Sequence, residues 1–213
     1  MTSGSDFESE DNSLYANSIW WDDEYKKCKK EDIYEWFTGS FDEDLMNLIY
    51  SLIPSKDSQI INLGCGISKI QEVIYDHGYK NITNIDISPK CIELCKESDT
   101  RGMKWLVCDA LKPLPFPNNS FDFAIDKGTF DALITERADK WTIGDDVYED
   151  AAQYFRQVYN ALKPGGVFIQ ITFGQPHFRK RLFEQEEFDW KVNVHTLQPK
   201  RSFHFFVYEC RKN

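Results

Sequence analysis

Ile60-Ile61-Asn62-Leu63-Gly64-Cys65-Gly66 is a short apolar run that breaks into a glycine turn. A helical pattern of apolar residues follows, so the segment reads as a strand, a turn and the start of a helix. Glycine has no Cβ and adopts positive φ easily, which lets the backbone come close to a ligand. In α/β proteins this junction is where the chain approaches a nucleotide-like ligand. We therefore predict a ligand site at the end of this strand.

An acidic residue, Asp86, ends the next predicted strand, residues 81–86. The carboxylate of Asp86 stands where it can accept hydrogen bonds from both hydroxyls of a ribose. Dinucleotide sites share this pair of features but use the pattern G-x-G-x-x-G. Residues 64–69 read Gly-Cys-Gly-Ile-Ser-Lys and lack the third glycine. A ligand without a pyrophosphate therefore fits better.

Strand and helix patterns alternate along the rest of the chain. The apolar runs predict five strands, at residues 59–63, 81–86, 103–107, 121–126 and 167–173. Two β-rich segments, 190–196 and 203–208, lie close together in sequence and suit an antiparallel hairpin. We predict an α/β fold, a Rossmann-like three-layer sandwich with a seven-stranded, mostly parallel sheet and an antiparallel C-terminal hairpin.

Length and composition indicate one domain. The chain has 213 residues, of which 41% are hydrophobic and 28% charged, as in a globular protein with one sizeable core. We expect residues 1–13, which are polar and acidic, to be a disordered tail, and residues 14–213 to form a single domain. Aromatic residues are frequent between about residues 14 and 40. We expect this segment to be an aromatic lid over the ligand; a helix anchored on the core by its rings is compatible with this, because a lid also needs anchors.

The charge balance and the N-terminal sequence limit the binding partners and the cellular location that we expect for this protein. A formal net charge of −10 argues against a general nucleic-acid binder, which usually presents a basic face. Acidity could attract a basic protein, but it more often serves solubility. No run of about 18 apolar residues is present, so we expect no membrane span. Residues 1–12 lack the chemistry of a signal or mitochondrial transit peptide, so we expect a cytoplasmic protein.

The six cysteines are scattered and form no CxxC pair. Cys91 and Cys95 can share one helix face, but no neighbouring Cys/His pair in the sequence completes a zinc set. We expect reduced, mostly buried thiols and no metal site.

Several motifs occur in the order and spacing of a large enzyme family. They are Leu63-Gly64-Cys65-Gly66, Asp86, Cys108-Asp109-Ala110, Leu114-Pro115-Phe116, Ser120-Phe121-Asp122 and Leu162-Lys163-Pro164-Gly165-Gly166. In this the chain resembles the seven-stranded S-adenosylmethionine-dependent methyltransferases.

A second set of motifs is more restrictive. It comprises Trp21-Asp22 with Tyr25, Tyr34-Glu35-Trp36-Phe37, Asp126-Lys127-Gly128-Thr129-Phe130-Asp131-Ala132-Leu133, Pro176-His177-Phe178-Arg179 and Phe203-His204-Phe205. These resemble the branch of lysine methyltransferases that act on translation elongation factor 1-alpha. The resemblance covers nearly the whole chain from about residue 19. Asn62 and Phe130 depart mildly from the usual pattern, and Asn62 weakens any assignment of contacts to the methionine amino group.

The resemblance implies that S-adenosyl-L-methionine is the cofactor and S-adenosyl-L-homocysteine the product. It assigns Gly64 to the methionine part of the cofactor, and Asp86 with Ile87 to the ribose and the adenine edge. Asp109 would accept a hydrogen bond from the adenine amino group, and the Ala110 N–H would meet a ring nitrogen. The alternative for Asp109 is a turn-forming residue before the proline-rich loop.

The same resemblance assigns a methionine-end contact to the backbone or stem of Lys127, and a closing wall to Trp21, Tyr25 and Trp36. Aromatic faces near the cationic sulfonium would contribute on the order of 1 kcal/mol each. Pure packing is an equal alternative for these three rings when the residues are considered without the resemblance.

Methyl transfer to lysine requires a neutral amine held in line, so positioning and desolvation carry most of the catalysis. Asp126 and Asp131 are candidates to orient the incoming ammonium or to pass its proton to water, although for Asp131 we slightly favour a role as the cap of the short helix that begins there. We assign no catalytic base, so the catalytic residue is unknown. His177 suits a substrate loop, with a basic rim formed by residues 179–181.

The sequence leaves other functions open. A small-molecule methyltransferase would share the cofactor half of the chain and differ in the lid and residues 174–200. A lysine methyltransferase acting on mitochondrial citrate synthase, a non-catalytic cofactor-binding scaffold and a dinucleotide oxidoreductase are further alternatives. The favoured prediction is a monomeric protein-lysine methyltransferase that acts on elongation factor 1-alpha and binds neither nucleic acid nor membrane.

Overall fold

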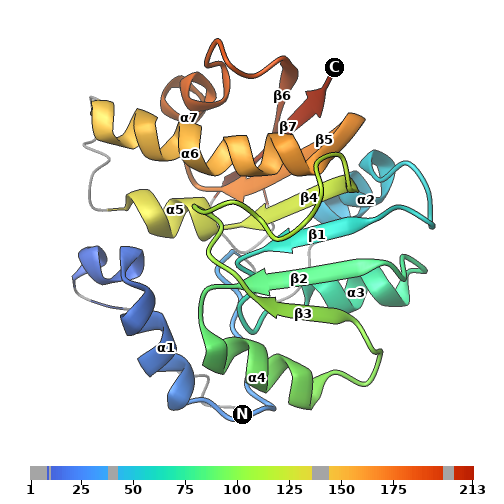
Figure 1. Cartoon of the computed structure of the whole chain (residues 1–213), viewed down its shortest axis with the longest axis vertical. Helices are drawn as coiled ribbons and strands as arrows, with labels where there is room; N and C mark the ends of the chain where they lie inside the picture. The colour runs from blue at the N-terminus through green and yellow to red at the C-terminus, as the bar shows by residue number, and fades with distance from the viewer. Residues whose placement is uncertain (1–8, 10, 38–42, 136–143, 199–203) are drawn as a thin grey trace.

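A single mixed sheet organises the chain (Figure 1). The computed structural model describes residues 9, 11–37, 43–135, 144–198 and 204–213. The strands are β1 (Ile60–Leu63), β2 (Ile82–Asp86), β3 (Lys104–Val107), β4 (Phe121–Lys127), β5 (Leu162–Thr172), β6 (Trp190–Leu197) and β7 (Phe205–Lys212). Their order across the sheet is β3-β2-β1-β4-β5-β7-β6.

The first five strands run parallel, and the C-terminal pair adds the antiparallel part. β7 lies between β5 and β6 and is antiparallel to both. The strand order reverses between β1 and β4. The chain adds β2 and β3 on one side of β1 and then adds β4 on its other side. In open α/β sheets, ligands bind at the carboxyl ends of the strands beside such a reversal. The predicted seven-stranded sheet and its antiparallel hairpin are confirmed.

Helices cover both faces of the sheet. They are the 3-10 helix η1 (Asn12–Ala16), α1 (Ser18–Lys26), α2 (Glu43–Leu52), α3 (Ile70–Asp76), α4 (Pro89–Ser98), α5 (Thr129–Ile134), α6 (Asp145–Ala161) and α7 (Pro176–Phe183). Buried residues of α2, α3 and α4 pack on one face of the sheet, and those of α5, α6 and α7 pack on the other. In Figure 1, α2 and α3 lie behind the sheet and α6 lies in front of it. The predicted three-layer sandwich is confirmed.

Local sequence explains where the helices begin. Ser88 accepts a hydrogen bond from the Cys91 N–H at 3.1 Å, and Pro89 occupies the first helical position of α4, as predicted. In α6, Val147, Ala151 and Phe155 recur at helical spacing and are buried. These starts direct the chain back across the sheet after each strand.

Three local expectations differ from the structure. Strand β5 begins at Leu162 and includes the Pro-Gly-Gly segment that was expected to precede it, because Leu162 already pairs with Phe121 before the register shifts. Pro176–Phe183 is a helix where a loop was expected, because proline suits a first helical position. The helix η1 begins at Asn12, inside the predicted disordered tail, and Asp11 caps it through the Ser13 N–H.

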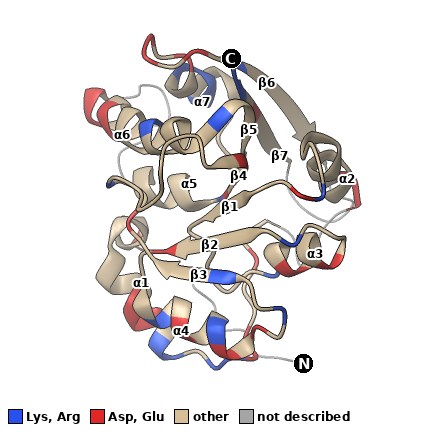
Figure 2. Ribbon diagram, turned by 45° about the vertical axis from the view of Figure 1, so that its right-hand side comes forward, with Lys and Arg blue, Asp and Glu red and all other residues tan. Residues whose placement is uncertain are grey.

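Charged residues of both signs are distributed along the surface. Figure 2 shows acidic and basic residues intermixed along α1 and α4. Within the residues that the structure describes, no helix is long and apolar enough to cross a membrane.

Candidate functional site

A pocket opens at the carboxyl ends of β1 to β4, beside the reversal of strand order. It encloses about 800 Å³, counting the solvent-filled space at its mouth. All nine residues that the resemblance assigns to the cofactor line it: Trp21, Tyr25, Trp36, Gly64, Asp86, Ile87, Asp109, Ala110 and Lys127.

The glycine turn after β1 is held against the start of α5. Gly64 has a φ of +58°, and a Cβ built there would lie within 2.5 Å of the Thr129 methyl carbon. The Thr129 hydroxyl donates to the carbonyl of Leu63 at 2.8 Å. Glycine is therefore needed at position 64 both for its backbone conformation and for this close approach. The contact joins the turn after β1 to the turn after β4, which together form the floor of the pocket.

Asp86 ends β2 inside the pocket and is only 6% exposed. Its two carboxylate oxygens accept hydrogen bonds from the Gly66 N–H at 2.9 Å and the Ser88 N–H at 3.0 Å. Each oxygen has a second lone pair, so the carboxylate can still accept from a ligand hydroxyl. Burial raises the pKa of Asp86 to about 6. The side chain is thus held rigidly and is mainly ionised at neutral pH.

Asp109 follows β3, makes the local turn that was considered for it and also lines the pocket. Its Oδ1 accepts from the Leu111 N–H at 2.9 Å, which makes a local turn, and its Oδ2 lies 3.5 Å from the Lys112 ammonium. The same residue lines the pocket together with Ala110. The turn therefore positions Asp109 without removing it from the ligand space.

Six aromatic side chains form a cluster over the pocket, which we call the aromatic lid: Tyr15, Trp20, Trp21, Tyr25, Tyr34 and Trp36. Trp21 stacks on Tyr25 with ring centroids 5.9 Å apart and meets Trp36 edge-on at 6.0 Å. Packing within this cluster and lining of the pocket occur together, so the two readings of the aromatic residues do not exclude each other.

Glu35 anchors the aromatic lid to the pocket. Its carboxylate accepts from the Ser68 hydroxyl at 2.9 Å and lies 2.9 Å from the Lys127 ammonium. The side chains of Glu35 and Lys127 are 10% and 8% exposed, so the ion pair is nearly buried. The Lys69 N–H donates a further hydrogen bond at 2.6 Å. The lid is thus tied to the loops after β1 and β4, and the Lys127 charge is neutralised within the pocket.

Asp126 has a structural role that differs from the expected one. It is 0% exposed and accepts hydrogen bonds from the backbone N–H groups of Thr129 and Phe130, from the Tyr154 hydroxyl and from the Gln170 amide. Burial raises its pKa to about 6. Asp126 therefore caps α5 and does not face the pocket, so the prediction that Asp131 caps this helix is wrong.

Asp131 instead forms a second buried contact. It accepts from the Thr172 hydroxyl at 2.7 Å and forms a short ion pair with Arg179, whose guanidinium lies 5.0 Å from the Phe130 ring centroid. Arg179 is 5% exposed. The expectation that Arg179 contributes to an exposed basic rim is therefore wrong, because its charge is paired inside the fold; Arg181 is exposed, and so is His177 in the first turn of α7.

Several residues of the site were not assigned from the sequence, and four of them carry polar or aromatic side chains that matter for its structure. Tyr34, Ser68 and Thr129 line the pocket, and Glu35 holds its lid. The available signals were an acid placed among aromatic residues at 34–37 and a hydroxyl directly after Lys127-Gly128. Neither signal identifies its partner, because the partners are distant in sequence.

Comparison with known proteins gives the family. Residues 61–170 match a protein family described as "Methyltransferase domain". The EEF1A lysine methyltransferase 4 of Mus musculus is 32% identical over 200 residues, which covers 93% of this chain and 77% of that protein. The chain belongs to the S-adenosylmethionine-dependent methyltransferases.

Other relatives of this methyltransferase agree with that family. The eEF1A lysine and N-terminal methyltransferase homolog of Drosophila melanogaster is 34% identical over 176 residues, covering 80% of this chain and 24% of that protein. A solved S-adenosylmethionine-dependent methyltransferase from Methanosarcina mazei superposes with a TM-score of 0.55 at 20% identity, over 78% of this chain and 96% of that one. This second likeness shows the shared fold.

The residues present fit S-adenosylmethionine. The pocket offers a buried carboxylate at the end of β2, a second acid at the end of β3 and aromatic rings above the glycine turn. Ile87 is 37% exposed, although it is a large apolar residue within the pocket, and so presents a surface for an apolar ring. This donor set matches a ribose, an adenine and a cationic sulfur.

Proposed function

We propose that this methyltransferase transfers the methyl group of S-adenosyl-L-methionine to a lysine side chain of translation elongation factor 1-alpha. The observation that carries the proposal is the 32% identity to a relative with that activity in its name, over 93% of the chain. The aligned region is far longer than the family match at residues 61–170. The similarity therefore extends beyond the cofactor half of the chain.

We propose individual roles for the pocket residues. Asp86 accepts hydrogen bonds from the ribose hydroxyls, which its remaining lone pairs support. Asp109 and Ala110 contact the adenine edge, with Ile87 against the ring. Gly64 lets the backbone approach the methionine part, and the Lys127 backbone or stem borders the same end.

We propose that Trp21, Tyr25 and Trp36 close over the cofactor and exclude water. Their mutual contacts and the anchoring of the neighbouring Glu35 support a preformed wall. When bound, S-adenosylmethionine supplies an electrophilic methyl group on a cationic sulfur. Aromatic faces stabilise a nearby cation by on the order of 1 kcal/mol each.

The chain's contribution to the reaction is positioning. The substrate amine must arrive in line with the methyl group, and it must be neutral although the pKa of free lysine is about 10.4. An apolar aromatic entrance favours the neutral amine because it desolvates the charged form. Asp126 is fully buried in the α5 cap, so we propose that the proton leaves to water rather than to this carboxylate.

We also propose that the protein works as a cytoplasmic monomer and binds neither nucleic acid nor membrane. The net charge of −10 supports the absence of nucleic-acid binding, because phosphate contacts need clustered basic residues. A cytoplasmic location follows from the proposed substrate, which serves translation.

Methyl transfer into a cell lysate tests the proposal. The lysate comes from a strain that lacks this protein, and radiolabelled S-adenosylmethionine is added with the protein or with its Asp86→Ala variant. The expected result is one labelled protein band, identified as elongation factor 1-alpha, that the variant does not produce. Label that appears only in small molecules would instead assign the protein to small-molecule methylation.

A further inference from the structure

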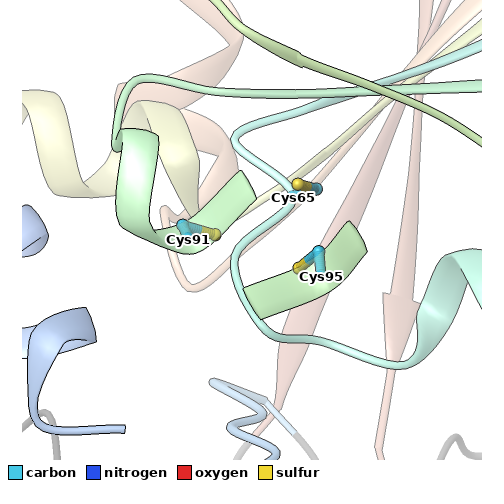
Figure 3. Close-up of side chains that lie close together, drawn as sticks. All are labelled: Cys65, Cys91 and Cys95. Atoms are coloured by element: carbon cyan, nitrogen blue, oxygen red, sulfur yellow. The ribbon is translucent and has the colours of Figure 1, made fainter. Parts of the chain in front are cut away.

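Three buried thiols converge beside the glycine turn (Figure 3). The sulfur atoms of Cys65, Cys91 and Cys95 all lie within 4.8 Å of one another. The residues are 4%, 0% and 5% exposed. Figure 3 shows them projecting from the turn after β1 and from α4 into the space between these segments. We call this group the cysteine cluster.

The fold assembles the cluster from distant parts of the sequence. Cys91 and Cys95 lie one turn apart on α4, so they share a face of this helix. Cys65 belongs to the glycine turn, and the Cys95 thiol lies 3.3 Å from the carbonyl oxygen of Gly66. The third thiol is therefore brought to the pair by the packing of α4 against the turn.

Buried cysteines most often act as small apolar side chains. The geometry of this cluster also permits metal binding, because one ion can contact all three sulfurs. A thiolate–metal bond of about 2.3 Å places three ligand sulfurs about 4 Å apart around a central ion. Sulfurs within 4.8 Å of one another reach this arrangement by side-chain movements of under about 1 Å.

The number and type of ligands select the ion. Within the described residues, no fourth Cys, His, Asp or Glu offers an atom within 4.8 Å of all three sulfurs, whereas structural zinc sites usually have four protein ligands. Asp86 lies beside Cys91, but both of its oxygens accept hydrogen bonds from the Gly66 and Ser88 N–H groups. Soft thiolate ligands favour Cu(I), which forms stable sites with sulfur alone. We propose that the cysteine cluster is a binding site for a soft, thiophilic monovalent metal ion of the Cu(I) type, coordinated by the three sulfurs.

Binding exchanges protons for the metal. Each thiol that coordinates the ion releases its proton to the solvent, and the metal keeps its oxidation state. Protons compete with the ion for the sulfurs, so the apparent affinity increases with pH. An ion in this place would link the glycine turn to α4. It would stabilise the folded chain in proportion to its affinity.

The test is an anaerobic titration of the fully reduced protein with Cu(I) against a chromophoric Cu(I) chelator, bicinchoninate. We expect one Cu(I) per chain, an affinity that increases with pH, and a higher midpoint of thermal unfolding for the loaded protein. Cys91→Ala is expected to weaken binding about tenfold or more. Cys210→Ala is the matched control, because Cys210 is also 0% exposed but lies outside the cluster, and it should leave the affinity unchanged.

X-ray absorption of the loaded wild-type protein provides a readout that does not depend on a variant folding. Three sulfur ligands around copper are the expected result. The proposal is overturned if the chelator retains all the copper, if Cys91→Ala and Cys210→Ala bind equally well, or if absorption shows fewer than three sulfurs. Preferential binding of Zn²⁺ in a four-coordinate site would overturn the choice of ion.

Discussion

Gly64 and Thr129 meet where the turns after β1 and β4 touch. The Thr129 hydroxyl fills the space that a side chain at Gly64 would need and bonds the carbonyl of Leu63 at 2.8 Å. The glycine was predicted from the sequence as a residue that lets backbone approach a ligand. The structure adds a second reason, because the closest atoms to an added Cβ belong to the protein itself.

Two glycine substitutions separate backbone strain from steric overlap. Gly102 has a φ of +74° and no atom within 4 Å of an added Cβ, so Gly102→Ala should lower the free energy of unfolding by about 1 kcal/mol through backbone strain alone. Gly64→Ala adds overlap with Thr129 and should lower it by roughly a further 1–3 kcal/mol. Urea unfolding measures both values. Equal losses for the two variants would contradict the contact.

Asp86 should make cofactor affinity depend on pH. Burial raises its pKa to about 6, so the carboxylate protonates as the pH falls through 6 and loses acceptor capacity for the ribose. The dissociation constant for S-adenosylmethionine, measured by calorimetry, should increase about tenfold per pH unit well below 6. Asp86→Asn should bind weakly at every pH. A wild-type affinity that stays constant from pH 7.5 to 5 would contradict the assignment.

The same raised pKa predicts the opposite trend for stability. The folded state binds this proton more tightly than the unfolded state, in which Asp has its ordinary pKa, so the contribution of Asp86 to stability increases as the pH falls from about 7 towards 4. Asp126, whose pKa is also raised to about 6 by burial, acts in the same direction. As the pH falls in this window, the affinity for S-adenosylmethionine should therefore decrease while the contribution of these two carboxyl groups to stability increases.

At the level of secondary-structure elements, one nearly buried ion pair joins the aromatic lid to the sheet. Glu35 lies between Tyr34 and Trp36 and holds Lys127 at the end of β4. The lid was predicted from its aromatic composition, whereas its anchor was not. A single acid in a polar-aromatic segment gives no sign of a partner that lies 92 residues later in the sequence.

Glu35→Gln should loosen this lid. It leaves the Lys127 ammonium unpaired, and breaking a buried pair in this way costs about 3–5 kcal/mol when burial is complete. We expect a smaller loss of stability for this pair and about a tenfold weaker affinity for S-adenosylmethionine. Asp23→Asn is the control, because its ion pair with Lys26 is exposed and such pairs contribute less than about 1 kcal/mol. Unchanged cofactor affinity in Glu35→Gln would exclude an anchoring role.

Helix α7 carries two arginines with different surroundings. Arg179 is buried against Asp131 and Phe130, and Arg181 is exposed. Arg179→Ala should therefore lower the thermal unfolding midpoint by several degrees, because it removes a buried guanidinium and leaves the partly buried Asp131 carboxylate without its partner. Arg181→Ala should leave the midpoint unchanged, and any effect of it on the KM for the protein substrate reports a surface contact. A stable Arg179→Ala variant would contradict the buried pair.

At the scale of the whole molecule, the sequence predicted the architecture and the position of the pocket. The alternating strand and helix patterns predicted a seven-stranded, mostly parallel sheet with a C-terminal hairpin, and all nine predicted cofactor residues line the pocket. The side-chain partnerships inside it were not predictable. Asp126 and Asp131 belong to one motif, but Asp126 caps α5 and Asp131 pairs with Arg179. The sequence does not indicate these roles, because the partners Tyr154 and Arg179 come from other elements.

Mass spectrometry of purified components tests whether elongation factor 1-alpha is the methyl acceptor. Purified elongation factor 1-alpha is incubated with S-adenosylmethionine and with the protein or its Asp86→Ala variant, and then digested and sequenced. We predict methyl groups on a specific lysine of the factor, matched by an equal amount of S-adenosylhomocysteine, with the wild-type protein only. Tight binding of S-adenosylmethionine by the wild-type protein without methylated lysine in the factor would contradict this prediction.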